Sequence, residues 1–293
     1  MEKIGIVLKP NAPQGEALLE KLIPWLSDHG KKVLMIDPKK QKGIPRVDMI
    51  VVLGGDGTLL SVAQRIAGTD IPILAVNLGH LGFLTEVASD ELYSNLTKIL
   101  MNAYERDSRM MLDCILLRGT KKVKRSTVLN DIVIDKGSLG RLIKMEVMVD
   151  GQFVAWLRGD GLIIASATGS TAYNLSSGGP IVHPSVDAIL LTPISPQLLT
   201  NKPIVIPATS NIRVILRSEE VGPVLTFDGQ EVLPLKFNDQ VDIQASANRL
   251  NFIRSSERNY YHVLREKLQW GAGRERDAIG RHKGTKLTRS LRA

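Results

Sequence analysis

A carboxylate set among glycines is the group best suited to chemistry in this 293-residue chain. Asp56 lies in the segment Gly54-Gly55-Asp56-Gly57-Thr58, directly after the apolar run Met49–Leu53 and before a helical pattern that begins at Leu59. Glycines let backbone N–H groups approach phosphate oxygens, and the following helix would point its positive end at the same ligand. Asp56 could accept a proton from an attacking hydroxyl or help to hold a magnesium ion.

The alternative for this segment is a tight strand–helix turn with Asp56 as its N-cap. The segment is neither the GxGxxG dinucleotide fingerprint nor a Walker A loop, because Gly57 is followed by Thr58 and not by Gly-Lys.

Two other segments offer polar groups for a ligand. Gly159-Asp160-Gly161 leads into an apolar strand and then into Thr168–Ser176 and Gly178-Gly179-Pro180, which are rich in small and hydroxyl side chains suited to sugars, amides and a flat base. Asn130-Asp131 is a polar pair embedded in an apolar strand, and a ligand with several hydroxyls would satisfy it. The alternatives are a plain loop for the first segment and a β-bulge or strand end for the second.

The sequence context of two histidines and of the cysteine indicates structural roles. His80 and His183 lie near glycine and proline turns, and Cys114 lies in an apolar strand as a small core residue. No pair of histidines has metal-ligand spacing, so the sequence implies only a loosely held magnesium ion. A single cysteine excludes an internal disulfide and a cysteine-based zinc cluster.

The elements that must position these groups change in type near residue 106. Before it, strand and helix patterns alternate, which predicts an α/β domain with a parallel sheet covered on both sides. Its last helix is expected over Ser89–Tyr104 with Ser89 as N-cap. After it, short strand patterns follow one another, among them Val241–Gln244 and Leu250–Ile253, and one helix is expected to begin near Thr171. We therefore predict an α/β domain over residues 1–105, a β-rich domain over 106–256, an amphipathic segment over 257–270 and a tail over 271–293.

The composition is that of a globular protein, with 43% hydrophobic and 23% charged residues. The formal net charge is +8, of which the 23 tail residues carry +5, from seven basic and two acidic side chains. The composition of this tail predicts a disordered, solvated extension without a partner, and we expect no contact with a membrane or with nucleic acid. The alternative is a tail that touches nucleic acid or an anionic membrane. No membrane-length apolar run and no signal peptide is present, so we expect a cytoplasmic protein.

Taken together, the segments resemble the NAD kinases, which transfer phosphate from ATP to the 2′-hydroxyl of the adenosine ribose of NAD. The similarity covers nearly all of residues 1–270 and includes Gly54–Thr58, Leu81–Thr85, Asn130-Asp131, Asp160-Gly161 and the run from Thr168 to Pro180. The first loop is shared with diacylglycerol and sphingosine kinases and approximately with phosphofructokinases, and the Thr-Gly-Ser-Thr-Ala-Tyr run narrows the match. The resemblance implies the two-domain NAD kinase/diacylglycerol kinase-like fold.

The resemblance also implies a role for each matching residue. Asp56 would deprotonate the ribose 2′-hydroxyl, and its flanking glycines would hold phosphates and the dinucleotide, with Mg²⁺ bound together with ATP. The positions that would line NAD are Gly54, Gly55, Gly57, Asn130, Asp131, Arg158, Asp160, Thr171, Ala172, Tyr173 and Ser176, with Arg141 and Gln230 as less secure contacts. Family members assemble as dimers or tetramers through the β-rich domain, so a homodimer or homotetramer is expected.

The chain departs from the family pattern at two positions. Asp131 stands where the family has Glu, which shortens the reach of the carboxylate by about 1.5 Å, roughly one carbon–carbon bond. Gln197 stands where many members have His, so no acid–base role is expected there. Two other functions stay open: a lipid kinase of the diacylglycerol type, and a non-catalytic dinucleotide sensor whose tail binds nucleic acid.

Overall fold

The computed structural model describes residues 1–38, 43–79, 81–138, 141–219, 222–254 and 259–270. His80 and the basic tail lie outside this described part of the chain, so the expectations for them stay predictions.

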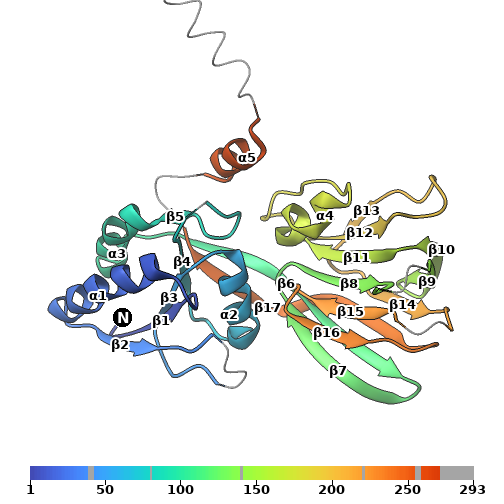
Figure 1. Cartoon of the computed structure of the whole chain (residues 1–293), viewed down its shortest axis with the longest axis horizontal. Helices are drawn as coiled ribbons and strands as arrows, with labels where there is room; N and C mark the ends of the chain where they lie inside the picture. Colours follow the sequence, from blue (N-terminus) through green and yellow to red (C-terminus); the bar gives the residue numbers. More distant parts are fainter. Residues whose placement is uncertain (39–42, 80, 139–140, 220–221, 255–258, 271–293) are drawn as a thin grey trace, which may run out of the picture.

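The first part of the chain forms a parallel sheet whose central strands are entirely buried (Figure 1). Its strands, in spatial order, are β2 (Lys32–Met35), β1 (Lys3–Leu8), β3 (Met49–Leu53), β4 (Ile73–Asn77) and the short β5 (Val87–Ala88). The helices α1 (Pro13–Asp28) and α3 (Leu92–Leu100) pack on one face, and α2 (Asp56–Ile66) packs on the other. Because both faces are covered, the strands read as continuous apolar runs.

The second part of the chain forms two packed antiparallel layers. One layer continues the first sheet, and its strands are β6 (Arg106–Arg118), β7 (Lys121–Val128), β9 (Ile143–Val149), β10 (Gln152–Gly159), β14 (Ile212–Leu216) and β17 (Gln240–Ile253). The other is a six-stranded sheet of β13 (Ile204–Pro207), β12 (Ala188–Ile194), β11 (Gly161–Ser166), β8 (Asp131–Asp135), β15 (Val224–Phe227) and β16 (Glu231–Pro234). A single cluster of buried, mainly aliphatic side chains fills the space between them.

The long strand β17 joins the two parts. Its first half pairs with β6 and β14 in the second part, and Phe252 near its end pairs in parallel with Ile73 of β4. The first sheet therefore runs through the whole molecule. The helix η1 (Ser89–Glu91) precedes α3, the helices η2 (Thr168–Thr171) and α4 (Tyr173–Ser176) follow β11, and α5 (Tyr260–Leu268) follows β17. Figure 1 shows α5 above the gap between the two parts.

The predicted fold class is confirmed: a parallel α/β part is followed by a β-rich part. Two expectations about single elements were wrong. The helix expected over Ser89–Tyr104 is η1 followed by α3, which ends at Leu100. Ser89 is not its N-cap, because the Glu91 side chain accepts the backbone N–H of Ala88 instead. The two strands expected over 241–244 and 250–253 are one strand, β17, with an irregularity between Ala245 and Arg249 that breaks the polar–apolar alternation.

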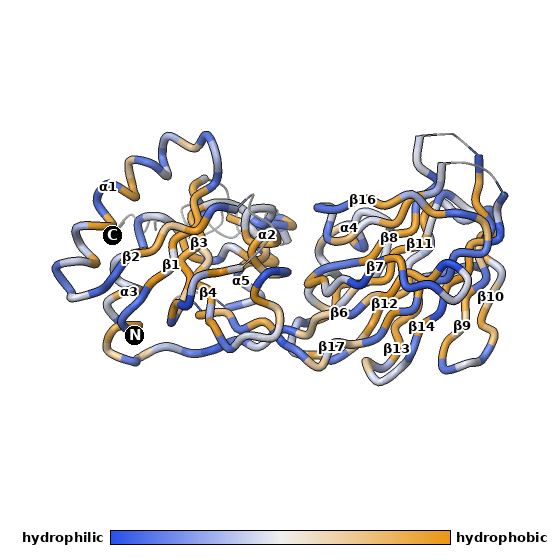
Figure 2. The backbone as a smooth tube through the Cα atoms, turned by 90° about the horizontal axis from the view of Figure 1, so that it is seen from below, coloured by the Kyte–Doolittle hydropathy of each residue, from blue (hydrophilic) through white to orange (hydrophobic). Residues whose placement is uncertain are grey.

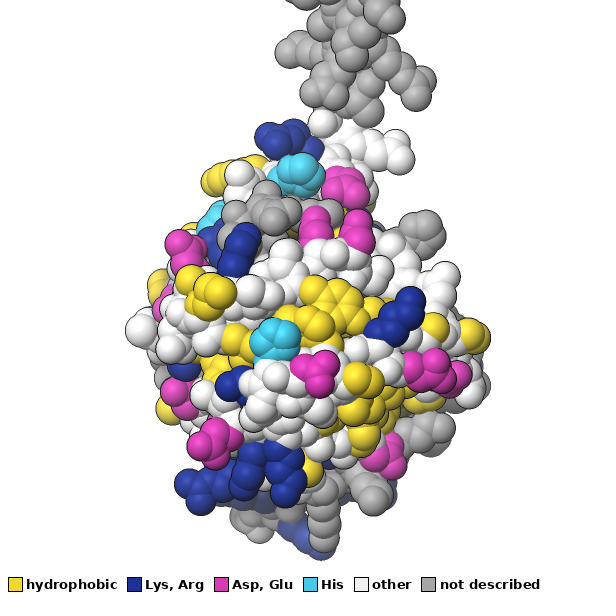
Figure 3. Space-filling view, turned by 90° about the vertical axis from the view of Figure 1, so that its left-hand side faces the viewer, with side chains coloured by type: hydrophobic (Ala, Val, Ile, Leu, Met, Phe, Trp, Pro, Cys, Tyr) yellow, Lys and Arg dark blue, Asp and Glu magenta, His cyan; other side chains and the backbone are white. Residues whose placement is uncertain are grey.

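Hydrophobic residues follow the strands of both parts, as Figure 2 shows. At the end of the molecule that carries α1, a hydrophobic patch lies near the centre of the face with charged side chains scattered around it, and Lys and Arg side chains gather at the lower left (Figure 3). Within the described ranges, no helix is both long enough and apolar enough to cross a membrane.

Candidate active site

The glycine segment lies where the sequence analysis expected it, at the carboxyl end of β3 between the parallel strands β1 and β4. Gly55 caps α2, and Asp56 is the first residue of that helix. A methyl group on Gly54 would lie 2.6 Å from the Thr58 hydroxyl, so this glycine is required by packing. A methyl group on Gly55 or Gly57 would meet no protein atom within 4 Å, so these two glycines border open space at the helix N-terminus.

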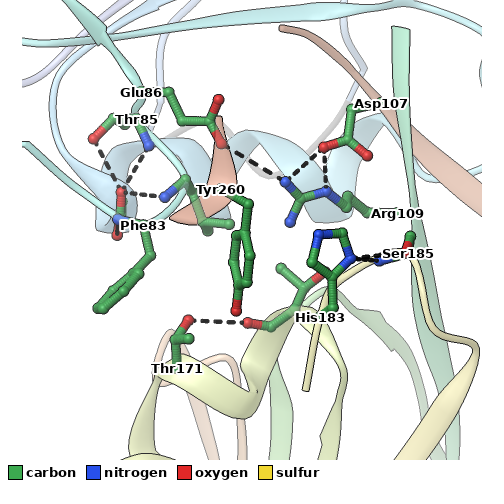
Figure 4. A network of polar contacts seen from close by, with 12 residues as sticks. Phe83, Thr85, Glu86, Asp107, Arg109, Thr171, His183, Ser185 and Tyr260 are labelled. Carbon is green, nitrogen blue, oxygen red and sulfur yellow. Dashed lines mark hydrogen bonds and ion pairs between the residues drawn. The ribbon is translucent and has the colours of Figure 1, made fainter. Parts of the chain in front are cut away.

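The Asp56 carboxylate is fixed by the segment that follows β4, in which Figure 4 labels Phe83 and Thr85. Its Oδ2 atom accepts the backbone N–H of Phe83 at 3.0 Å. Its Oδ1 atom accepts the N–H groups of Leu84 and Thr85 at 3.3 and 3.1 Å and the Thr85 hydroxyl at 3.0 Å. Oδ1 is thus saturated, whereas Oδ2 accepts from a single donor and retains a lone pair for a ligand.

Gly82 makes this close approach possible. An added Cβ at residue 82 would overlap both Asp56 Oδ1 and the Thr85 hydroxyl. The Leu81–Thr85 segment is therefore a clamp on the carboxylate. In the sequence, this segment stands out only through the family resemblance, and Gly82 is the residue that could have indicated the close contact with Asp56.

A buried arginine supports the far end of the clamp. The Arg109 guanidinium donates to Asp107 at 2.7 and 2.8 Å and lies 3.9 Å from the Glu86 carboxylate, next to Thr85. Its side chain is only 6% exposed, and it lies over the Phe252 ring at 5.6 Å. Because the Arg109 charge is balanced by two carboxylates, it can be buried beside the site.

Helix α5 contributes Tyr260 to this group of contacts. Figure 4 shows the Tyr260 ring between Arg109 and the segment that carries Thr171. This ring contacts His183 edge-on, with centroids 4.6 Å apart, and its hydroxyl is 3.5 Å from the Val182 carbonyl oxygen. His183 also hydrogen-bonds Ser185 at 2.7 Å. These contacts are consistent with the structural role expected for His183.

Asn130 lies in a strand break and not within a strand, which corrects the first interpretation of this segment. β7 ends at Val128 and β8 begins at Asp131. The Asn130 side chain is 8% exposed, and its Oδ1 atom is buried without a hydrogen-bond partner among the described residues. An added Cβ on Gly169 would overlap the Asn130 carbonyl group, so η2 packs directly against this break. The unsatisfied oxygen is the strongest sign of a ligand on this side of the site.

Asp131 is a buried carboxyl group at the start of β8. Burial and, to a smaller extent, the nearby Asp228 carboxylate raise the pKa of Asp131 to about 7. The shorter side chain noted in the sequence is therefore held inside the protein, where a ligand that donates hydrogen bonds would favour its ionised form.

The helices η2 and α4 carry Thr171, Ala172, Tyr173 and Ser176 along one short stretch. Asn174 anchors this stretch, because its amide donates to the carbonyl groups of Ser170 and Pro180 and its oxygen accepts from Thr192 at 2.6 Å. Tyr173 is 42% exposed. Partial burial is the main cause that raises the pKa of Tyr173. The negative charges of Asp135, Asp160 and Asp131 raise it further.

The remaining residues predicted to line the site lie outside the group formed by Asp56, Asn130 and the 171–176 stretch. Asp160 forms an ion pair with Lys136 at 2.7 Å in the turn between β10 and β11. Arg158 is exposed in β10, and Arg141 is exposed just before β9. Gln230 follows β15 and lines a cavity of about 630 Å³ between α2 and β7, away from η2. Cys114 is fully buried in the core, where burial raises the pKa of its thiol, as expected for a structural residue.

Comparisons with known proteins decide the family. A model of the ATP-NAD kinase N-terminal domain matches residues 40–104, and a model of the ATP-NAD kinase C-terminal domain matches residues 129–255. The NAD kinase of Geobacter sulfurreducens is 44% identical over 283 residues, which cover 92% of this chain and 99% of that protein. The chain belongs to the NAD kinase family. Its activity is the phosphorylation of NAD.

Other NAD kinases and related solved structures agree with this assignment. The NAD kinase of Syntrophotalea carbinolica is 42% identical, with 92% of this chain and 99% of that protein covered. The crystal structure of yeast NADH kinase complexed with NADH has a TM-score of 0.84 and 25% identity, and it covers 99% of this chain and 90% of the other. An NAD kinase from Archaeoglobus fulgidus in complex with ATP has a TM-score of 0.72 and 25% identity, with coverages of 87% and 94%. An NAD kinase needs no lipid groove and is not a non-catalytic sensor, so both alternatives are set aside.

Proposed function

We propose that the enzyme transfers the γ-phosphate of ATP to the 2′-hydroxyl of the adenosine ribose of NAD, with Asp56 as the general base. The observation that carries this role is the held carboxylate at the N-terminus of α2, with a lone pair left on Oδ2 and open space beside Gly55 and Gly57. Two solved relatives, one in complex with ATP and one complexed with NADH, support the donor and the class of acceptor.

Each of the two parts of the molecule binds one of the two substrates. The backbone N–H groups at Gly55–Gly57 bind the donor phosphates, while Asn130, Asp131 and the 171–176 stretch orient NAD. Asp56 Oδ2 accepts the proton of the 2′-hydroxyl as its oxygen bonds to the γ-phosphorus. The bond from that phosphorus to the β,γ-bridging oxygen breaks, and ADP leaves. The Asn130 Oδ1 atom accepts a hydrogen bond from a hydroxyl or amino group of NAD.

Magnesium would enter with the ATP phosphates. Mg²⁺ usually keeps several waters and binds largely through substrate phosphates, so the ATP phosphates would supply most of its ligands. The lone pair left on Asp56 Oδ2 stays with the 2′-hydroxyl proton, because Oδ1 already accepts three hydrogen bonds. When bound, the ion would neutralise phosphate charge during transfer.

We also propose a cytoplasmic homodimer or homotetramer that assembles through the β-rich part. The edge strands β10 and β13 expose apolar side chains, including Phe153, Trp156 and Val205, which are about half exposed. Exposed edge strands with apolar side chains favour association with another chain. Light scattering after size exclusion measures the mass, and Trp156→Lys should reduce it to that of a monomer.

The test of the reaction is a coupled assay. Purified protein is incubated with ATP, Mg²⁺ and NAD, and NADP is followed by an NADP-specific dehydrogenase. Asp56→Asn keeps the size of the side chain but removes the base, so we expect a loss of at least about 100-fold in kcat. Asp90→Asn, an exposed change in η1, serves as the control and should retain full activity. Equal kcat in Asp56→Asn and wild type would remove Asp56 from proton transfer while leaving the kinase activity in place.

A further inference from the structure

Asp228 is a buried carboxylate that the reaction scheme does not use. It lies in the tight turn between β15 and β16, is 5% exposed and has a positive φ of 49°. Its carboxylate accepts three consecutive backbone N–H groups: Leu129 at 2.9 Å, Asn130 at 2.7 Å and Asp131 at 3.1 Å. In return, its own N–H donates to the Asp131 carbonyl oxygen at 3.0 Å.

The strand break explains why a carboxylate is needed at this point. The β8–β15 ladder ends at the pair Ile132–Phe227, so it supplies no acceptors for the amides that precede residue 132. Buried N–H groups must find partners, and a carboxylate can accept several at once. Asp228 therefore replaces the missing ladder and fixes the backbone of the break.

This backbone carries the two side chains that face NAD in the proposed reaction. Asn130 presents its unpartnered Oδ1 atom, and Asp131 presents its buried carboxyl group, from the same three residues that Asp228 holds. On the opposite side, Ser166 binds the same break, because its hydroxyl donates to the Leu129 carbonyl oxygen at 2.6 Å and its N–H donates to the Asn130 carbonyl oxygen at 2.9 Å. The break is thus fixed from both sides while the Asn130 side chain is left available.

We propose that Asp228 is a positioning residue for the NAD subsite: it touches no substrate and acts by holding the Leu129–Asp131 backbone so that the Asn130 side chain meets the dinucleotide. This proposal rests on the proposed role of Asn130. Because Asp228 bonds the acceptor side of the site and not the clamp on Asp56, it governs the binding of NAD and leaves that of ATP unchanged.

The test uses Asp228→Asn in the full-length enzyme. Asn tolerates a positive φ and keeps one accepting oxygen, but its amide group faces an N–H donor of the break. We expect the KM for NAD to rise at least about tenfold, whereas the KM for ATP changes by less than about twofold. An equal rise in both constants would overturn the proposal, because it would show a general structural effect.

Asp239→Asn is the matched control. Asp239 is fully buried in the same part of the chain and also holds a turn, by accepting the Lys236 N–H at 2.8 Å and the Arg118 guanidinium at 2.7 Å. This variant should lower the melting temperature without changing either KM. The proposal fails if Asp239→Asn raises the KM for NAD as much as Asp228→Asn does.

A double-mutant cycle with Asn130→Ala separates this proposal from the proposed function. If Asp228 acts through Asn130, Asp228→Asn should add less than about twofold to the KM for NAD when Asn130 is already Ala. A full additional tenfold rise would overturn the positioning role. If Asn130→Ala alone leaves the KM for NAD unchanged, the assigned role of Asn130 fails instead.

Hydrogen exchange of backbone amides tests the same proposal in the wild-type enzyme, so it does not depend on whether a variant folds. The amides of Leu129, Asn130 and Asp131 should be protected from hydrogen exchange in the free enzyme, at the level of the neighbouring strand β8. Fast exchange of all three would show that Asp228 does not hold them, and the proposal would be wrong.

Discussion

The Oδ1 atom of Asp56 lies 3.0 Å from the hydroxyl oxygen of Thr85 and 3.1 Å from the backbone nitrogen of the same residue. Two donors from a single residue thus fix one carboxylate oxygen, and the other oxygen keeps the capacity to act as a base. The orientation of the proposed base is therefore set by a segment 29 positions away in the sequence.

Thr85→Val tests this contact. Valine keeps the shape and the backbone N–H but loses the hydroxyl donor, so Asp56 is less well oriented. One such hydrogen bond is worth about 1 kcal/mol, and we expect kcat to fall by roughly fivefold to tenfold, with little change in either KM. Thr97→Val, which removes a hydroxyl that binds Tyr93 within α3, is the control and should leave kcat unchanged.

Gly82→Ala should be more damaging than Thr85→Val. The added methyl group would overlap Asp56 Oδ1 and the Thr85 hydroxyl, so the clamp must open and the carboxylate must move. We expect kcat to fall at least about 100-fold, because misplacement of a reacting group by about 1 Å costs that much. Gly79→Ala is the matched control in the same segment, since its methyl group would meet no atom within 4 Å. Similar kcat values for the two variants would show that Gly82 does not secure the base.

Local patterns were sufficient to predict the longer strands of the first part and the place of the glycine segment, but not the short strand β5 or the end of α3 at Leu100. β3 and β4 are continuous apolar runs, and Asp56 follows one of them directly. The clamp on Asp56 could not be predicted from local patterns, because three of its four donors are backbone N–H groups, which carry no side-chain signature. The strand break at Asn130 was only the alternative interpretation of its segment, since the capping carboxylate of Asp228 lies 98 positions away and leaves no local signal.

Gly57→Ala should separate ligand binding from folding. Its methyl group would enter open space at the N-terminus of α2, where the donor phosphates are proposed to lie, and alanine favours a helix more than glycine does. We expect an unchanged or raised melting temperature together with a rise of at least about tenfold in the KM for ATP. Gly54→Ala is the contrasting variant, since its methyl group meets the Thr58 side chain and should lower the melting temperature. An unchanged KM for ATP in Gly57→Ala would place the phosphates elsewhere.

Asp131→Asn should change stability in a pH-dependent way. The pKa of Asp131 is about 7 in the folded protein, against a reference of 3.8, chiefly because the side chain is buried. Below about pH 4 the carboxyl group is protonated in both the folded and unfolded states, so it does not favour unfolding. As the pH rises toward 7 the unfolded chain gains the ionised form first, and the wild type loses about 1.4 kcal/mol of stability for each pH unit in this window.

The Asn variant has no ionisable group at this position and escapes that loss. Its melting temperature relative to wild type should therefore increase between pH 5 and pH 8, and the increase should end once the pH exceeds the folded pKa of about 7. Thermal unfolding of both proteins without ligands, at several pH values in the same ionic strength, measures the difference. A difference in melting temperature that stays constant from pH 5 to pH 8 would show that Asp131 is ionised throughout this range in the folded protein. In that case, bound NAD would meet a carboxylate and not a neutral acid at physiological pH.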